Sequence, residues 1–172
     1  KVDPGLTEED QAKVPGGKIF ADLCGPWPTS VRGHNMLLVA LDDHLGVVSA
    51  CPLHGKASGG IKQAITRFRE QLRKVRGVMS VDEPKVWVLK TDQGGEFEGL
   101  AEYVGNEGGI QETVPKERHV AQIEQLIRRM TEGVRTLLSA AGLTTVYWGY
   151  AAMAWCHNHN VTTCDKWLDM LR

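Results

Sequence analysis

The sequence predicts a mixed α/β fold, with helices covering both faces of one five-stranded sheet. Three observations lead to this prediction. Two apolar runs joined by a short polar link that ends in glycine indicate a hairpin. Helix-like and strand-like segments then alternate along the chain. A strand, a helix and another strand in succession require a crossover, so part of an otherwise antiparallel sheet must be parallel.

The first part of the chain contains three predicted strands and a long helix. Lys18–Cys24 alternates weakly between apolar and polar residues, which favours a strand. Met36–Leu41 and Val47–Leu53 form the hairpin. From Ser58 onward, apolar residues recur at steps of three and four, which predicts an amphipathic helix that ends before Gly77. These apolar residues are Ile61, Ala64, Ile65, Phe68, Leu72 and Val75.

The stretch from Lys85 to Phe97 is the centre of the prediction. Val86–Leu89 is an almost continuous apolar run, which is typical of a strand buried on both faces. Asp92 follows just past the carboxyl end of this strand. An acidic side chain there is costly unless a positive group, such as a metal ion, compensates it. An ordinary polar turn over Asp92-Gln-Gly-Gly95 explains this stretch equally well.

The second half is predicted to be mainly helical. A short helix containing Leu100, Tyr103 and Val104 ends near Gly105, and a brief strand covers Gly108–Thr113. A long helix follows and is closed by Gly142. Its apolar positions are Val120, Ile123, Ile127, Met130, Val134, Leu137 and Ala141. The last helix covers Thr145–Asn158. Its inner face is predicted to consist of Trp148, Ala151, Ala152 and Trp155.

Composition suits a soluble globular domain. The 172 residues are 42% hydrophobic and 24% charged. A chain of this length can bury a hydrophobic core without stabilisation by disulfides or metal ions. No apolar run has the length of a membrane span, and no signal peptide opens the chain. The four cysteines lack CxxC spacing, so we expect a reducing, intracellular setting. Because the chain starts without Met and ends abruptly after Arg172, we expect it to be a piece of a longer protein.

Charge is informative locally, because the net charge of −1 carries no signature of nucleic-acid binding. Basic residues gather on two segments, and for the first of these a solvated helix face is the simplest interpretation. The first segment contains Lys62, Arg67, Arg69, Arg73, Lys74 and Arg76. The second contains Lys116, Arg118, Arg128, Arg129 and Arg135.

Acidic residues suggest a metal site. Asp22 and Asp92 are predicted on strands that would be neighbours, so their carboxylates would converge at one end of the sheet. A third ligand and divalent cations would turn their repulsion into binding. Glu124 is predicted to stack against the apolar stripe of the long helix and to point toward the core. Glu117 and Glu132 are alternatives that periodicity leaves open.

Five short segments occur in a characteristic order over residues 18–165. They are Phe20-Ala-Asp22-Leu-Cys-Gly25-Pro26, Val39-Ala-Leu-Asp42-Asp43, Leu89-Lys-Thr-Asp92-Gln-Gly-Gly-Glu96-Phe97, Glu124 leading to Arg135-Thr-Leu-Leu138, and Tyr147-Trp148-Gly with Asn158-His-Asn160. In this order they resemble the catalytic core of copia-type retrotransposon integrases. The segment around Asp92 is the most specific of the five.

The resemblance implies an RNase H-like fold and an Asp–Asp–Glu triad formed by Asp22, Asp92 and Glu124. This triad would hold a pair of Mg²⁺ or Mn²⁺ ions, which activate a water or a DNA 3′-hydroxyl and stabilise the leaving oxygen. The implied reaction is trimming of the element's DNA 3′ ends, followed by strand transfer into target DNA. Asp42 and Asp43 match acidic hairpin residues of the family, and we expect them to be turn formers.

The resemblance also implies DNA contacts. Arg128 and Arg129 lie about one helical turn beyond Glu124 and are the best candidates for positioning phosphates. An intrahelical ion pair of Arg128 with Glu124 or Glu132 is the alternative. Weaker candidates for DNA contact are Lys90 and Lys116.

The implied organisation is a flexible linker or arm over residues 1–17, the integrase core over 18–165, and the start of a linker or a truncated segment over 166–172. The implied partners are the element's DNA ends, target DNA and further copies of the chain, with no membrane. The implied location is the nucleus and a cytoplasmic virus-like particle. The family's zinc-binding domain would precede this core, and Lys1–Gly17 contains none of its His and Cys ligands.

Two departures keep other functions open. Pro115–Ile123 lacks the Asn-Gly of the family's loop before the glutamate, and the spacing from Asp92 to Glu124 is shorter than in such enzymes. A catalytically inactive or domesticated module that binds nucleic acid or protein is therefore the alternative. A structure-specific or RNA:DNA-hybrid nuclease of the same fold is disfavoured, because the matching segments are those of integrases.

Overall fold

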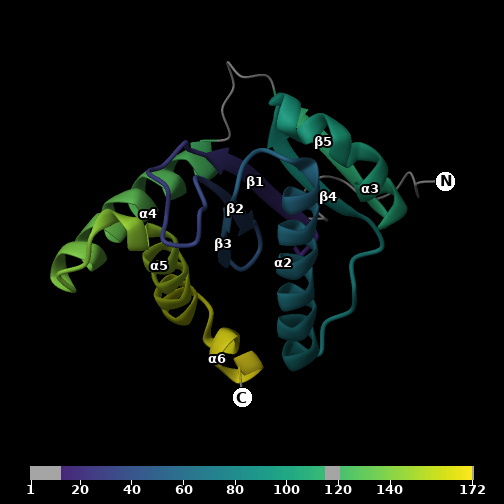
Figure 1. Ribbon diagram of the computed structural model, residues 1–172. Helices are drawn as coiled ribbons and strands as arrows, with labels where there is room; N and C mark the ends of the chain where they lie inside the picture. Colours follow the sequence, from purple (N-terminus) through teal and green to yellow (C-terminus); the bar gives the residue numbers. More distant parts are fainter. Residues whose placement is uncertain (1–12, 115–120, 172) are drawn as a thin grey trace.

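A five-stranded mixed sheet forms the centre of the computed structural model, which describes residues 13–114 and 121–171 (Figure 1). The strand order is β3-β2-β1-β4-β5. The strands are β1 (Lys18–Cys24), β2 (Met36–Asp42), β3 (Val48–Leu53), β4 (Trp87–Asp92) and β5 (Gly109–Val114). Neighbours among β1, β2 and β3 are antiparallel, whereas β4 is parallel to both β1 and β5. The predicted mixed α/β fold is confirmed.

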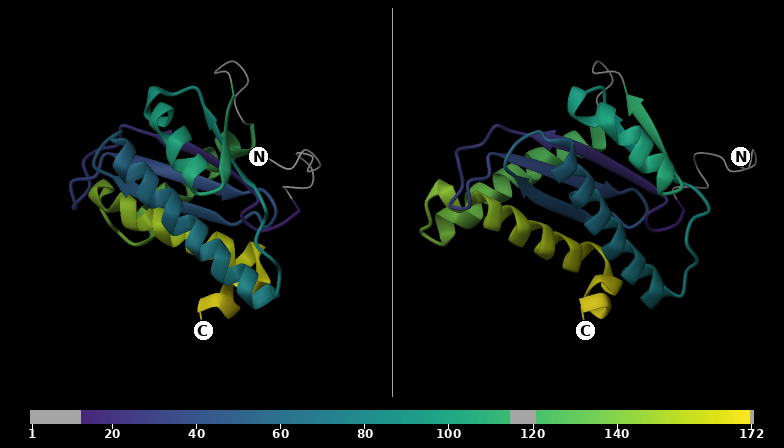
Figure 2. Two further views of the ribbon diagram at one scale, coloured as in Figure 1. Left: turned by 90° about the vertical axis from the view of Figure 1, so that its right-hand side faces the viewer. Right: turned by 45° about the vertical axis from the view of Figure 1, so that its right-hand side comes forward.

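Helices lie on both faces of this sheet, as predicted (Figure 2). The α-helices are α2 (Ser58–Met79), α3 (Ala101–Asn106), α4 (Ala121–Ala140), α5 (Trp148–Thr163) and α6 (Asp165–Leu171). Within the described residues, the 3₁₀ helices η1 (Gly95–Leu100) and η3 (Thr145–Tyr147) precede α3 and α5. No helix in the described part of the chain combines the length and the apolar character needed to cross a membrane.

The sheet separates two hydrophobic cores. Ile19 and Ala21 of β1 pack into the core under α2, α3 and α6. Phe20 of the same strand packs into the core under α4 and α5. This alternation follows from the strand geometry, in which successive side chains point to opposite faces. The face that each side chain of β1 and β4 occupies can therefore be assigned.

Helix α2 is longer than predicted. It continues through Gly77 to Met79 and ends where Ser80 takes a left-handed conformation with φ 55°. The last turns are held by Arg76, which is 5% exposed and donates hydrogen bonds to the Pro15 carbonyl at 2.8 Å and to Glu83 at 3.1 Å. The prediction that the helix ends before Gly77 is wrong, because this tertiary anchor outweighs the low helix propensity of glycine.

The carboxyl-terminal region also extends beyond its prediction. Helix α5 reaches Thr163 because Asn160 is buried and its side chain bonds both the N–H and the carbonyl of Val48, each at 2.8 Å. Where we expected a linker to start, the structure has α6, whose Trp167 is buried in the α2 core. Buried side chains thus hold both segments against the sheet and α2.

Asp42 anchors the entry into β1. Its side chain is fully buried, and its two oxygens accept the N–H groups of Gly16 at 2.6 Å and Leu45 at 2.8 Å. The bond to Leu45 confirms the turn-forming role expected of Asp42. The bond to Gly16 adds a second role, because it ties the segment before β1 to the end of β2.

Candidate active site

Asp22 and Asp92 lie at the carboxyl ends of two adjacent parallel strands. The last paired position of β1 with β4 joins Phe20 to Lys90, and the two aspartates come two residues further along each strand. Strand β4 runs through Asp92, so this residue ends the strand and does not follow it as predicted. The prediction that the strands carrying Asp22 and Asp92 are neighbours in the sheet is confirmed.

Both aspartates belong to the face of the sheet that α4 covers. Asp22 is two residues after Phe20, which packs into the α4–α5 core. Asp92 is three residues after Leu89, which packs into the opposite core. Since side chains alternate along a strand, both carboxylates point to the α4 side. Each aspartate is half-buried.

Backbone N–H groups orient the two carboxylates. The N–H of Leu23 donates to Asp22 Oδ1 at 2.7 Å, and the N–H of Gly94 donates to Asp92 Oδ1 at 3.0 Å. The second bond is the short-range turn that Asp side chains commonly make two residues onward. The polar-turn interpretation of Asp92-Gln-Gly-Gly95 is therefore correct as a description of the backbone. It does not conflict with a site, because the same turn fixes the Asp92 carboxylate.

Gly94 permits close approach of two carboxylates. A Cβ on Gly94 would lie 2.9 Å from Asp92 Oδ1 and 2.9 Å from Glu96 Cδ. The Glu96 side chain is 16% exposed and pairs with Lys56 Nζ at 3.3 Å. The sequence-based site does not include Glu96. Its signal in the sequence was Gly94, because a residue without a Cβ leaves room for the carboxylates of Asp92 and Glu96 to approach.

Glu124 lies in the first turn of α4 and is exposed. The prediction that it points toward the core is wrong. Helix α4 presents to the sheet a stripe rotated from the predicted one, in which Leu126 and Leu138 are buried while Ile127 and Leu137 are only partly covered. The exposed carboxylate is nevertheless carried by the helix that covers the face of Asp22 and Asp92. The alternative Glu132 is also exposed, and Glu117 lies outside the described residues.

The donor chemistry fits a hard divalent cation, but only in part. Asp22 and Asp92 offer carboxylate oxygens, which Mg²⁺ and Mn²⁺ prefer. Within residues 13–114 and 121–171, no three His, Cys, Asp or Glu side chains form a group that could hold a metal ion. The arrangement thus offers two carboxylates on adjacent strands, with Glu96 near Asp92 at Gly94 and Glu124 exposed on α4.

Cys24 forms an apolar neighbour of Asp22. The pKa of its thiol is raised to about 11, mainly by burial; a hydrogen bond with Trp27 lowers it and the charge of Asp22 raises it by smaller amounts. The thiol is therefore neutral near pH 7 and is neither a nucleophile nor a metal ligand there.

The predicted DNA-contacting cations differ in their surroundings. Lys90 pairs with Glu112 at 3.3 Å on the neighbouring strand. Arg128 and Arg129 are exposed on α4, and no ion pair of the described residues joins Arg128 to Glu124 or Glu132. The intrahelical alternative for Arg128 is therefore not observed. Lys116 lies outside the described residues.

Solved structures share this architecture. A chain of the simian T-cell lymphotropic virus intasome, in complex with the PP2A regulatory subunit B56 gamma, matches with a TM-score of 0.62 and 14% identity, over 86% of this chain and 50% of that chain. The catalytic core domain of BIV integrase matches with a TM-score of 0.55 and 14% identity, over 79% and 80%. The HTLV-2 integrase catalytic core domain in complex with magnesium, in its trimeric form, gives 0.54 and 15%, over 81% and 84%. At these identities the likeness shows the fold alone: the chain has the RNase H-like fold of integrase catalytic cores.

The chain is also similar in sequence to part of a retrotransposon polyprotein. Over 144 residues, the chain is 28% identical to the retrovirus-related Pol polyprotein from transposon TNT 1-94 of Nicotiana tabacum. The match covers 81% of this chain and 10% of that polyprotein, so the chain spans about a tenth of its relative. No family model matches the chain.

Proposed function

We propose that this chain is the catalytic core of a retrotransposon integrase, which trims DNA 3′ ends and joins them to target DNA with divalent metal ions. The observation that carries the proposal is the placement of Asp22 and Asp92 on one face of the sheet, at the ends of adjacent parallel strands. The integrase-like fold and the similarity to a retrotransposon Pol polyprotein support it.

Asp22 and Asp92 would hold the metal through their oxygens, each oriented by its neighbouring backbone N–H. A pair of bound divalent ions supplies activation of the attacking hydroxyl and stabilisation of the leaving oxygen. The protein's own contribution is positional: the sheet and the two backbone N–H groups fix the carboxylates. A fixed pair of hard ligands is what in-line displacement at phosphorus requires.

Glu124 is our candidate for the third ligand. It is exposed, and no ion pair of the described residues engages it, so its carboxylate is available to a metal. Catalytic geometry is often loose before substrate binds and tightens in the complex. Glu96 is the alternative, because its carboxylate and that of Asp92 both approach Gly94.

DNA is the proposed substrate, with Arg128 and Arg129 contacting phosphates beyond the carboxylates on α4. Such contacts position a duplex without reading its sequence. Self-association is also proposed, since one matching structure is an intasome and another is a trimeric form.

The decisive assay is Mn²⁺-dependent joining of a labelled oligonucleotide end to a target duplex by the full-length protein. Asp92→Asn is expected to lower joining by about a hundredfold or more, because metal ions stabilise the transition state by several kcal/mol. DNA binding should persist in this variant. Joining that is indifferent to Asp92→Asn would refute the metal site.

A catalytically silent binding module is the second candidate, favoured by the exposed Glu124 and by the lack of a three-ligand group in the described chain. It predicts salt-sensitive DNA or protein binding that does not respond to divalent ions. Wild type and Asp22→Ala would then show equal, weak affinity for Mg²⁺ in calorimetric titrations.

A further inference from the structure

A cavity of about 450 Å³ lies where the loop after β1 meets α4 and the start of α5. We call it the Trp27 pocket; its lining includes Cys24, Trp27, Thr131, Arg135, Thr145 and Trp148. This volume falls within the range of about 300–1,000 Å³ that is typical of sites for small molecules. None of the candidate metal ligands lines the pocket, so the proposed metal chemistry does not use it.

The Trp27 pocket begins one step beyond Asp22 on the same face of the sheet. Phe20, Asp22 and Cys24 alternate along β1, and both Phe20 and Cys24 pack against the α4–α5 core. Two residues of a strand span about 7 Å. A ligand held at Asp22 therefore has this pocket as its neighbour along the strand.

One face of α4 leads from the candidate third ligand to the pocket. Steps of four, three and four residues place four side chains on this face: Glu124, Arg128, Thr131 and Arg135. Thr131 and Arg135 line the pocket, whereas Glu124 lies in the first turn of the helix. A DNA strand whose phosphates follow this face would run from the carboxylates to the pocket.

Two tryptophans form an aromatic platform in the pocket. Trp148 is 1% exposed and its indole N–H donates to the Pro28 carbonyl at 2.6 Å, so its ring is fixed. The ring of Trp27 is partly exposed and rests against it, with 5.1 Å between the ring centroids and 35° between the ring planes. A flat group that enters the pocket would therefore meet an aromatic surface that is already held in position.

Arg135 gives the pocket a positive charge that no lining acid neutralises. None of the lining residues is acidic, and Arg135 forms no ion pair with any residue that the structure describes. Its side chain is exposed, so its guanidinium is available to a phosphate. Thr145 is also exposed, and its hydroxyl is available to the polar edge of a ligand.

This combination discriminates among occupants. Nucleobases of any sequence stack on aromatic side chains, and cationic groups beside such platforms follow the phosphates. An apolar side chain of a partner protein would use the tryptophans but would leave Arg135 without a counter-charge. A second copy related by a twofold axis would bring the same patch, with its own Arg135, against this one.

From these features, we propose that the Trp27 pocket receives an unpaired nucleobase from the DNA end that is held at Asp22 and Asp92. This inference rests on the proposed function and extends it from the reacting phosphate to a neighbouring base. The base stacks on Trp27, and Arg135 binds the adjacent phosphate. Stacking offsets the cost of unpairing the base, so the pocket keeps the end of the duplex open beside the carboxylates.

The test is fluorescence anisotropy of the full-length protein with labelled duplexes in EDTA, where no joining takes place. One duplex ends in an unpaired overhang, and its partner carries abasic sites in place of the overhang bases; 5′ and 3′ overhangs are both measured. For at least one of them, wild type should bind the overhang with bases about tenfold more tightly than the abasic one, because of base stacking. Trp27→Leu should remove this preference.

Matched variants separate the pocket from the fold. Trp27 and Trp155 are both partly buried against the α4–α5 core, but only Trp27 lines the pocket, so Trp155→Leu should keep the preference. Thr145→Trp fills the pocket from an exposed position and should remove the preference, whereas Thr144→Trp, at the exposed position before it, should not. Asp92→Asn should keep the preference, which separates base binding from the metal site.

Several outcomes would overturn the proposal. If wild type bound overhangs with and without bases equally, while Arg128→Gln still weakened DNA binding, the pocket would not hold a base and the proposed function would stand. If no duplex bound at all, the proposed function would fail and this inference with it. A preference that survived both Trp27→Leu and Thr145→Trp would place the base elsewhere. If Thr145→Trp left the preference intact but converted a dimer to a monomer in sedimentation, the pocket would be an interface between copies.

Discussion

Asp22 and Asp92 lie level with each other on neighbouring parallel strands, two residues beyond the paired Phe20 and Lys90, and both point to the face covered by α4. Two half-buried carboxylates so arranged repel each other. A divalent cation between them would convert this cost into binding energy. The proposed enzyme follows from this relationship.

Neutralising either aspartate should remove stabilisation by metal. For wild type, Mn²⁺ at about a hundred times its Kd should stabilise the fold by about 2.7 kcal/mol. Asp22→Asn and Asp92→Asn should gain little from Mn²⁺, because an amide is a weaker ligand for a hard cation than a carboxylate. Thermal melts with and without Mn²⁺ measure this. Glu98→Gln, at an exposed residue of η1, is the control and should respond to Mn²⁺ like wild type.

Gly94→Ala should impair the site, because the new Cβ would stand 2.9 Å from Asp92 Oδ1 and displace that carboxylate or Glu96. The φ of −70° at Gly94 is accessible to alanine, so the fold itself should tolerate the change. We expect Mn²⁺ affinity in calorimetry to fall about tenfold. Gly95→Ala is a matched control because a Cβ there meets nothing within 4 Å. Equal losses in both variants would count against steric displacement.

Glu124→Gln should abolish DNA joining while leaving stability nearly unchanged. Because Glu124 is exposed, the free energy of unfolding in urea should shift by less than about 0.5 kcal/mol. Glu132→Gln, on the same helix and also exposed, should keep full activity. If Glu96→Gln lost activity and Glu124→Gln did not, the third ligand would be Glu96.

Removing charge from α4 should weaken DNA binding and flatten its salt dependence. Arg128→Gln and Arg129→Gln should each reduce the slope of log affinity against log salt by about one, since each contact with a phosphate releases a counterion. Arg73→Gln on α2 serves as the control. Unchanged slopes in both α4 variants would mean that DNA does not cross this helix.

Asp42 gives a stability prediction that is independent of function. Burial raises the pKa of its carboxyl above the ordinary 3.8, and the N–H bonds from Gly16 and Leu45 oppose this rise. The folded state therefore binds this proton more readily than the unfolded state. In the window just above pH 3.8, lowering the pH should stabilise wild type relative to Asp42→Asn. Urea unfolding at several pH values measures the difference in the free energy of unfolding. If acidification lowered the stability of wild type relative to Asp42→Asn, the prediction would be wrong.

Truncation to Asp42→Ala should cost about 3 kcal/mol, because two backbone N–H groups lose their buried acceptor. Asp43→Ala is a suitable control, since Asp43 makes only a partly exposed pair with Lys18 at 3.6 Å. Urea unfolding at neutral pH measures both. Equal, small losses would show that water replaces the Asp42 carboxylate.

The sequence was a good guide where local patterns decide the outcome. The alternation of apolar and polar residues in Lys18–Cys24 located β1, and the apolar run before Asp92 located β4. The helix that connects the hairpin to β4 indicated that β4 joins the sheet in parallel. The orientation of Glu124 could not be predicted in this way. Helix α4 carries apolar residues on adjoining stripes, with Ile127 beside Leu126 and Leu137 beside Leu138, and only packing against the sheet selects between them.

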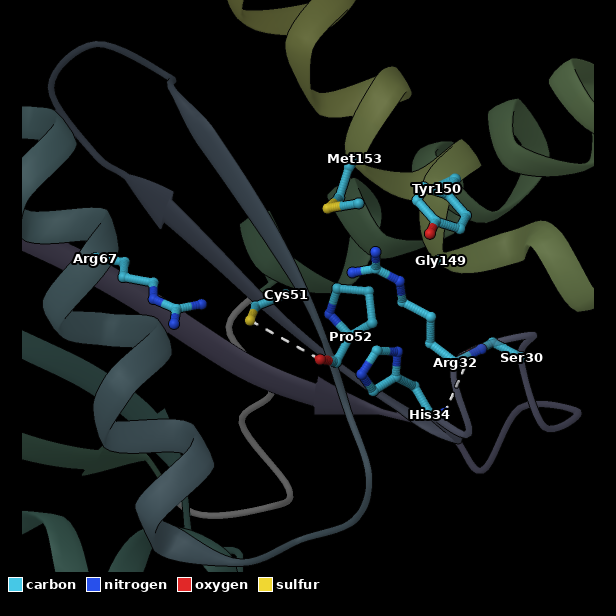
Figure 3. A pocket seen from close by; sticks show the side chains of 9 residues that line it. All are labelled: Ser30, Arg32, His34, Cys51, Pro52, Arg67, Gly149, Tyr150 and Met153. Atoms are coloured by element: carbon cyan, nitrogen blue, oxygen red, sulfur yellow. Dashed lines mark hydrogen bonds between the residues drawn. The ribbon is translucent and has the colours of Figure 1, made fainter.

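Tertiary contacts explain the other differences. The burial of Arg76 against Pro15 extends α2 past Gly77, and nothing in the local sequence signals that contact. Arg32, Arg67 and Tyr150 come from three separate segments and line one cavity (Figure 3), whereas the sequence pattern showed Arg67 only as part of a basic helix face. Sites assembled from distant segments become visible only in the fold.

The most direct test of the central claim is anomalous X-ray diffraction from crystals grown with Mn²⁺. The account predicts anomalous density between the carboxylates of Asp22 and Asp92, with Glu124 or Glu96 as a further ligand, and its loss in Asp92→Asn. Crystals in which both aspartates are ordered and no Mn²⁺ lies between them would contradict it.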